Sequence, residues 1–110
     1  MKYFKDYLDE LMFKKNLPAV QIYKKIWMQR QTFHKILNSK GIPHKTNVCH
    51  IAMAMRLNLK ETMDLLQQAG YGLSDFIGYD RCVKQMLTEG YTDEELGDFV
   101  LGFPENKKIA

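Results

Sequence analysis

The residues of this sequence best suited to recognising another molecule lie between positions 30 and 35. Their side chains are long or form hydrogen bonds, and none is acidic; they are Arg30, Gln31, Thr32, His34 and Lys35. A helix over this segment would bury the apolar residues that alternate with them, namely Phe33, Ile36 and Leu37. Arginine suits guanine and glutamine suits adenine through paired hydrogen bonds, so the outer face of such a helix suits the major groove of DNA.

Metal binding and catalysis are the other kinds of chemistry that these residue types allow. His34, His44, His50 and Cys49 do not pair at a ligand spacing such as Cys-x2-Cys, and the adjacent Cys49 and His50 would project about 100° apart on a helix. The sequence has no glycine-rich phosphate loop, no nucleophile with a candidate base and no carboxylate pair in a catalytic context. We therefore expect no metal, no cofactor and no enzymatic activity. The methionines fall mostly on apolar faces and are expected to fill the core.

Two short helices are predicted to position the polar residues, within residues 17–38. Ile22 and Ile26 are four residues apart, and so are Phe33 and Leu37, which gives each helix one apolar face. The phase of this pattern breaks at residues 27–29, as a short turn between two crossed helices would produce. The second helix would then begin at Arg30 and present the polar set to solvent.

Charge is distributed unevenly along the 110 residues, whose net charge is +3. Residues 1–60 contain twelve basic and three acidic residues, a net charge of +9, whereas residues 61–110 contain four basic and ten acidic residues, a net charge of −6. The basic half is the electrostatic footprint expected of a protein that binds a polyanion, although solvated surface on both halves is the alternative. No apolar run approaches the roughly 20 residues of a membrane helix, and Cys49 and Cys82 are expected to be free thiols. We therefore expect a cytoplasmic protein without membrane contact.

The remaining apolar periodicity is also helical, and no β-hairpin signal appears, so the chain is predicted to be all-α. Further helices are expected over about residues 3–15 and 45–57, after a cap formed by Asn58 and Glu61, over about 74–89, and after a capping box at residues 92–95. In the helix at 74–89 the apolar side chains are expected to point inward: Phe76, Tyr79, Val83, Met86 and Leu87. Residues 1–70 would form one domain, residues 71–103 an acidic helical extension, and residues 104–110 a flexible tail.

The order of these pieces resembles the five-helix helix-turn-helix domain of the lambda-repressor-like (Cro/C1, or XRE) transcriptional regulators. The resemblance covers residues 7–70 without gaps and is carried by Leu17, Ile22, Ile26, Arg30, Phe33, Ile36, Asn38, Pro43 and the Leu-Asn-Leu-Lys-Glu run at 57–61. Four positions depart from the family pattern: Ala19 replaces a glutamine, Tyr23 a small alanine, Trp27 the glycine of the turn, and His44 a serine cap.

The resemblance implies a transcriptional regulator that binds double-stranded DNA through the helix at about residues 30–38. The base contacts that it implies are those of Arg30, Gln31, Thr32, His34 and Lys35, and the phosphate contacts are those of Lys40, Lys45 and Thr46. Such regulators usually bind as dimers, so we expect a homodimer. Its contact is expected to use apolar residues of the extension, namely Phe76, Val83, Leu87, Leu96, Phe99 and Val100. The alternative is a protein-interaction adaptor that keeps the scaffold and binds a partner through Tyr23, Trp27 and the acidic face.

Overall fold

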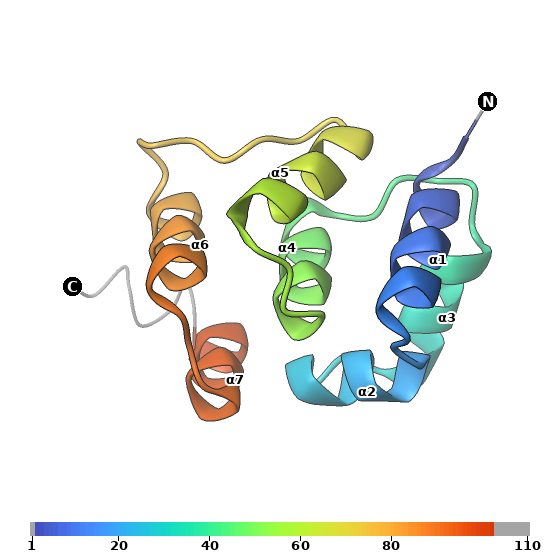
Figure 1. Ribbon diagram of the computed structural model, residues 1–110, viewed down its shortest axis with the longest axis horizontal. Helices are drawn as coiled ribbons and strands as arrows, with labels where there is room; N and C mark the ends of the chain where they lie inside the picture. The colour runs from blue at the N-terminus through green and yellow to red at the C-terminus, as the bar shows by residue number, and fades with distance from the viewer. Residues whose placement is uncertain (1, 103–110) are drawn as a thin grey trace.

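The computed structural model describes residues 2–102, which fold into helices joined by short loops (Figure 1). The elements are α1 (Phe4–Lys15), α2 (Ala19–Tyr23), the 3-10 helix η1 (Lys24–Ile26), α3 (Arg30–Asn38), α4 (Lys45–Ala54), α5 (Leu59–Gln68), α6 (Gly78–Glu89) and α7 (Asp93–Gly102). No strand occurs within residues 2–102, so the prediction of an all-α chain is confirmed. The predicted tail at residues 104–110 lies outside the described residues.

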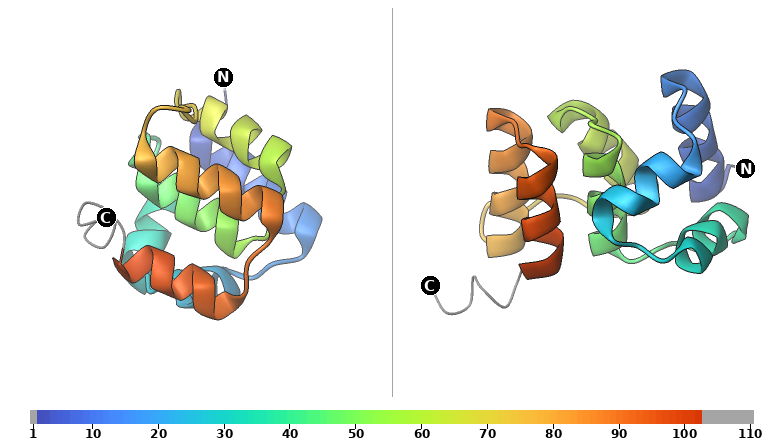
Figure 2. Two further views of the ribbon diagram at one scale, coloured as in Figure 1. Left: turned by 90° about the vertical axis from the view of Figure 1, so that its left-hand side faces the viewer. Right: turned by 90° about the horizontal axis from the view of Figure 1, so that it is seen from below.

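Helix α4 lies in the middle of the molecule and is buried on almost every side. Six of its side chains are buried: Val48, Cys49, Ile51, Ala52, Met53 and Ala54. A helix that is apolar all round belongs in a protein interior, and α4 contacts α2, η1, α5 and α7. Helices α1 and α3 lie at one end of the molecule and α6 and α7 at the other, with α4 and α5 between them (Figures 1 and 2).

Two of the helix starts follow from side-chain caps that the sequence predicts. Asn58 Oδ1 accepts a hydrogen bond from Glu61 N at 2.8 Å, and Glu61 Oε1 accepts one from Asn58 N at 3.0 Å. Thr92 and Glu95 exchange the same pair of bonds at 3.0 and 2.8 Å in front of α7. Each cap satisfies backbone N–H groups that a helix leaves without an internal partner. Both predicted capping boxes are confirmed.

Helix α6 begins later than the sequence predicts, at Gly78 rather than at about Ser74. Ser74 Oγ accepts a hydrogen bond from Phe76 N, and Ser74 N donates to Asp80 Oδ2 at 2.8 Å. These bonds give the backbone an alternative to helical pairing, as serine side chains often do. The prediction that Phe76 points inward is therefore wrong, because its side chain is 95% exposed.

The acidic extension shares its core with the rest of the chain. Val83, Leu96 and Phe99 are buried in the same hydrophobic cluster as Leu8 and Phe33. Of the other apolar residues that were expected to form a dimer contact, Leu87 and Val100 pack partly buried against this cluster. The apolar faces of α6 and α7 are thus largely used within the chain, and a homodimer through them stays a prediction.

The extension is also fastened by polar contacts near both ends of α4. At its first turn, Lys45 Nζ lies 2.6 Å from Asp80 Oδ2 of α6. Beyond its last turn, Arg56 donates a hydrogen bond to Tyr91 O at 2.6 Å and forms an ion pair with Asp93. The Tyr91 hydroxyl donates to Met53 O at 2.8 Å. These contacts span the segment at which composition predicts a domain boundary.

Within residues 2–102, no helix combines the length and apolar character that crossing a bilayer requires.

Candidate nucleic-acid interface

The turn that leads into α3 has a left-handed residue at its centre. Trp27, which follows η1, has φ 55° and ψ 24°, a conformation that glycine adopts most easily. Met28 N donates to Tyr23 O at 3.1 Å and closes the turn. The chain is thereby redirected between α2 and α3, and Arg30 becomes the first residue of α3. The predicted break in phase at residues 27–29 is confirmed.

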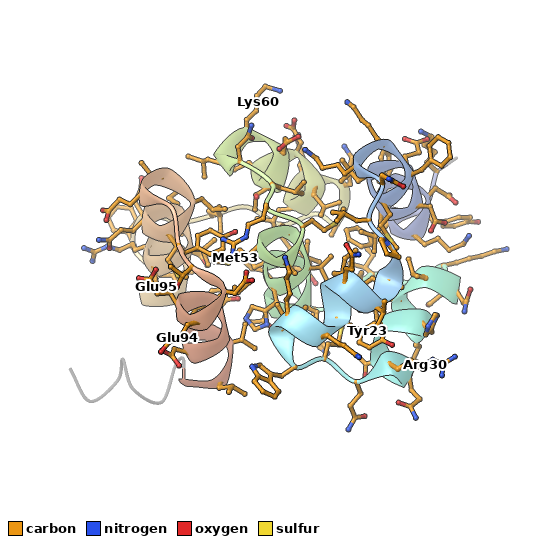
Figure 3. The ribbon with its side chains drawn as sticks, turned by 60° about the horizontal axis from the view of Figure 1, so that its bottom comes forward. Tyr23, Arg30, Met53, Lys60, Glu94 and Glu95 are labelled. Atoms are coloured by element: carbon orange, nitrogen blue, oxygen red, sulfur yellow. The ribbon has the colours of Figure 1, made fainter. Side chains whose placement is uncertain are left out.

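Helix α3 holds three of the five predicted base-contact residues in solvent. Phe33 is fully buried, and Gln31 and Lys35 are each about 200° around the helix axis from it. Both side chains are exposed, and so is that of Arg30 in the first turn. Figure 3 shows Arg30 at the outer edge of the molecule. Gln31 and Lys35, four residues apart, share one polar face, and Arg30 lies at the start of the helix beside it, so a binding partner can reach all three without any rearrangement of α3.

Thr32 and His34, the other two predicted base-contact residues, are partly buried. The His34 ring lies 6.4 Å from the rings of both Tyr23 and Phe33, in edge-on contact with each. Thr32 lines a groove together with Lys35. His34 therefore helps to pack α3 against α2, a role that spacing along α3 alone does not reveal.

That groove runs between α3 and the first turn of α4. Its lining is formed by Thr32, Lys35, Ile36, Ser39, Gly41, Ile42, Pro43, His44 and Asn47. The first helical bond of α4 is donated by Val48 N to His44 O, so the N–H groups of the three preceding residues have no partner within the helix. Unpaired N–H groups and the helix dipole make such an end electropositive. The groove thus combines a lysine with a helix end that favours anions.

The predicted phosphate-contact residues differ in how free they are. Thr46 is exposed on the first turn of α4, and Lys40 is exposed on the preceding loop, with its Nζ 5.5 Å from the centre of the Tyr3 ring. Lys45, by contrast, is held by Asp80, whose side chain is only 1% exposed. The Lys45 ammonium group is therefore engaged in an ion pair within the chain, and a phosphate would have to compete with Asp80 for it. Sequence reasoning missed Asp80 because it lies 35 residues away on another helix.

The charge of the molecule is polarised along its length. No Asp or Glu occurs between residues 11 and 60, which include all of α2, α3 and α4. The first turn of α7 contains Asp93, Glu94 and Glu95. Glu94 and Glu95 lie far from Arg30, on the opposite side of the view in Figure 3. A polyanion would therefore be attracted to the α3 end and repelled from α7.

The acidic end also contains a hollow, between α6 and α7, that has none of these basic residues. Met86, Tyr91 and Phe99 contribute to its lining, together with the carboxylates of Glu89 and Glu95. Carboxylates at this position disfavour nucleic acid, so the hollow is unsuited to the role that α3 suits.

A cluster of titratable groups, with Cys49 buried and His50 and Tyr79 partly buried, joins α4, α6 and α7. Burial raises the pKa of Cys49 to about 11, lowers the pKa of His50 to about 4, and raises the pKa of Tyr79 above its usual range. The rings of His50, Tyr79 and Phe99 lie 5.3 to 6.1 Å apart in pairs. Each of the three titratable groups is therefore neutral at pH 7, and the cluster acts as packing. Among residues 2–102, no group of three or more His, Cys, Asp or Glu side chains could hold a metal ion.

Comparison of the chain with protein-family models, with curated proteins and with solved structures found no match.

Proposed function

We propose that this protein is a sequence-specific DNA-binding regulator that inserts α3 into the major groove. The observation that carries the proposal is the exposed pair Gln31 and Lys35, opposite the buried Phe33, with the exposed Arg30 beginning the helix after a left-handed turn. A helix in the major groove places the side chains of its first turns next to base edges. Arg30 and Gln31 are the two residues there whose side chains can form paired hydrogen bonds with a base.

Phosphate contacts are assigned to the rim of the groove between α3 and α4. Lys35 lines this groove from α3, and His44 and Asn47 line it at the start of α4, where N–H groups have no partner within the helix; Lys40 lies on the loop between the helices. Contacts of this kind fix the position of a protein on DNA without reading its sequence. The arrangement of α1 to α5 as a lambda-repressor-like domain is part of this proposal and is supported by the turn at Trp27.

The alternative function, a protein-interaction adaptor, is favoured by one specific observation. Trp27 is 67% exposed, although it is the largest side chain in the turn. An exposed tryptophan supplies much of the binding energy in many protein interfaces. The adaptor function predicts that DNA affinity is absent or insensitive to the α3 residues.

The experiment begins with selection of bound duplexes from a random pool, followed by fluorescence-anisotropy titrations at two salt concentrations. Gln31→Ala is expected to weaken binding to a selected duplex by about 1–3 kcal/mol and to leave random DNA nearly unaffected. Lys40→Ala should weaken binding to both duplexes alike and lower the salt slope by about one.

Lys60→Ala is the matched control for the loss of one positive charge. Lys60 projects from α5 on the side of the molecule away from Arg30 (Figure 3). Its removal should leave DNA affinity and the salt slope nearly unchanged, because salt screens a charge that lies far from the DNA. If the Gln31, Lys40 and Lys60 variants all bind every duplex as the unmodified protein does, α3 is not a reading helix and the proposal fails.

A further inference from the structure

A surface that the proposed function does not use lies where the turn before α3 meets α7. Trp27 and Leu101, which are 67% and 63% exposed, line a shallow groove there. Gly97 lies beneath the indole, because a Cβ atom added at this glycine would come within 3.3 Å of Trp27 Nε1. The absence of a side chain at position 97 thus lets the indole lie against α7. We call this groove and its charged walls the Trp27 surface.

The backbone at Trp27 indicates that its side chain is retained for something other than stability. Its φ of 55° lies in the left-handed region, where a bulky residue is strained and glycine is not. A strained residue usually persists when burial of its side chain compensates, yet two thirds of this side chain is in solvent. Strain combined with exposure of a large aromatic group points to contact with another molecule.

The walls of the Trp27 surface have opposite charges. Lys24 and Lys25 belong to η1 on one side, and Glu94 and Asp98 belong to α7 on the other. Within residues 2–102, no ion pair forms at Lys24, Glu94 or Asp98, whereas Lys25 lies 4.0 Å from Asp93. The surface therefore has an apolar centre between one basic and one acidic wall. Each wall includes at least one charged side chain that forms no ion pair within residues 2–102.

We propose that the Trp27 surface is a self-complementary contact between two copies of this chain. A twofold axis that lies in the contact plane and runs parallel to the two walls places the basic wall of each copy on the acidic wall of the other, so the same attraction occurs twice. Trp27 and Leu101 from both copies then form the buried centre, which an interface needs in order to exclude water. A uniformly basic or acidic partner would match one wall and oppose the other. A second copy matches both.

The first test is the oligomeric state of the full chain without DNA, measured by sedimentation equilibrium from about 1 to about 500 µM, a range suited to small interfaces. Trp27 is the only tryptophan, so its fluorescence reports burial directly and should shift to shorter wavelength as dimers form. Trp27→Gly should weaken association by at least about tenfold and melt no lower than the unmodified protein, because glycine relieves the strain. Leu101→Ser should also weaken association.

The second test reverses one charge on each wall. Lys24→Glu gives a copy with a weakened basic wall, and Glu94→Lys gives a copy with a weakened acidic wall, so each variant alone should associate about tenfold more weakly. Mixed in equal amounts, the two variants restore one complementary pair of walls and should form heterodimers more tightly than either forms homodimers.

Three results would overturn the proposal. The first is an unmodified protein that stays monomeric throughout the range, which leaves the Trp27 surface to a different protein or to residues 103–110. The second is a Trp27→Gly variant that associates as strongly as the unmodified protein. The third is a mixture of charge variants that associates no better than its components. None of these measurements involves DNA, so they stand or fall separately from the proposed role of α3.

Discussion

Lys45→Ala is expected to destabilise the fold strongly, although Lys45 is a partly exposed lysine at the end of a helix. Its Nζ lies 2.6 Å from Oδ2 of Asp80, and that carboxylate is 1% exposed. Without the lysine, the donor that remains to this oxygen is Ser74 N at 2.8 Å. Removal of one partner from a buried ion pair leaves an uncompensated charge, which typically costs about 3–5 kcal/mol. The Lys45 side chain is 26% exposed, so water reaches the site and we expect the lower end, about 3 kcal/mol.

Urea unfolding followed by circular dichroism at pH 7 measures this loss. Lys60→Ala is the matched control, because Lys60 forms an ion pair with Asp64 at 3.2 Å and both side chains are exposed to solvent. Loss of this exposed pair should change the free energy of unfolding by less than about 1 kcal/mol. Asp80→Asn removes the buried charge and leaves Lys45 to turn toward water. In the double variant, the cost of Lys45→Ala should shrink by about 1–3 kcal/mol, the range of coupling between groups in contact.

A Lys45→Ala variant with the stability of Lys60→Ala would refute the reasoning, since it would mean that Asp80 does not depend on the lysine. The same result would return Lys45 to the set of lysines available for phosphate contacts. Because Lys45→Ala removes the partner of a buried carboxylate, it changes stability as well as charge, so Lys40 is the better residue with which to test a phosphate contact.

Two other predictions concern stability. Burial lowers the pKa of His50 from 6.5 to about 4, so the unfolded chain binds a proton that the folded chain excludes, and stability is lost as the pH falls below 6.5. Between pH 7 and pH 5 this loss should be about 2 kcal/mol, and His50→Phe should lack it; parallel pH profiles of urea unfolding for the two proteins would count against the assignment. Asn58→Ala removes the acceptor for Glu61 N and should lower the free energy of unfolding by about 1 kcal/mol. Asn58→Gly should recover most of that loss, and an alanine variant as stable as the unmodified protein would show that the cap contributes nothing.

The sequence predicts the helices well because the signals for them are local. Ile22 and Ile26 are both buried, and the capping boxes at Asn58 and Thr92 form from residues three positions apart. Local spacing also identifies Arg30 and Gln31 as exposed positions. Each of these features depends only on the geometry of a single helix or turn, which short stretches of sequence determine.

What the sequence does not predict depends on contacts between distant segments. The start of α6 depends on Asp80, which binds both Ser74 N and Lys45 Nζ and thereby competes with helix formation at residues 74–77. The partial burial of His34 depends on Tyr23, a residue of the preceding helix. The resemblance to a known family suggests glycine at position 27, and only the structure shows that Trp27 takes the glycine-like conformation and points outward. None of these outcomes is visible in the periodicity of one segment.

The fastening of α4 at both of its ends has a consequence for how the chain is made. On the ribosome, residues 1–70 emerge before α6 and α7, because synthesis proceeds from the N-terminus. Helix α4 then has no partner for Lys45 at one end or for Arg56 beyond the other, and the side of α4 that contacts α7 is still open to water. The contacts of α4 with α6 and α7 can form only after these two helices have left the exit tunnel. A chain interrupted after α5 would therefore leave the α7 side of its most apolar helix exposed to water, a surface of the kind that chaperones and proteases recognise.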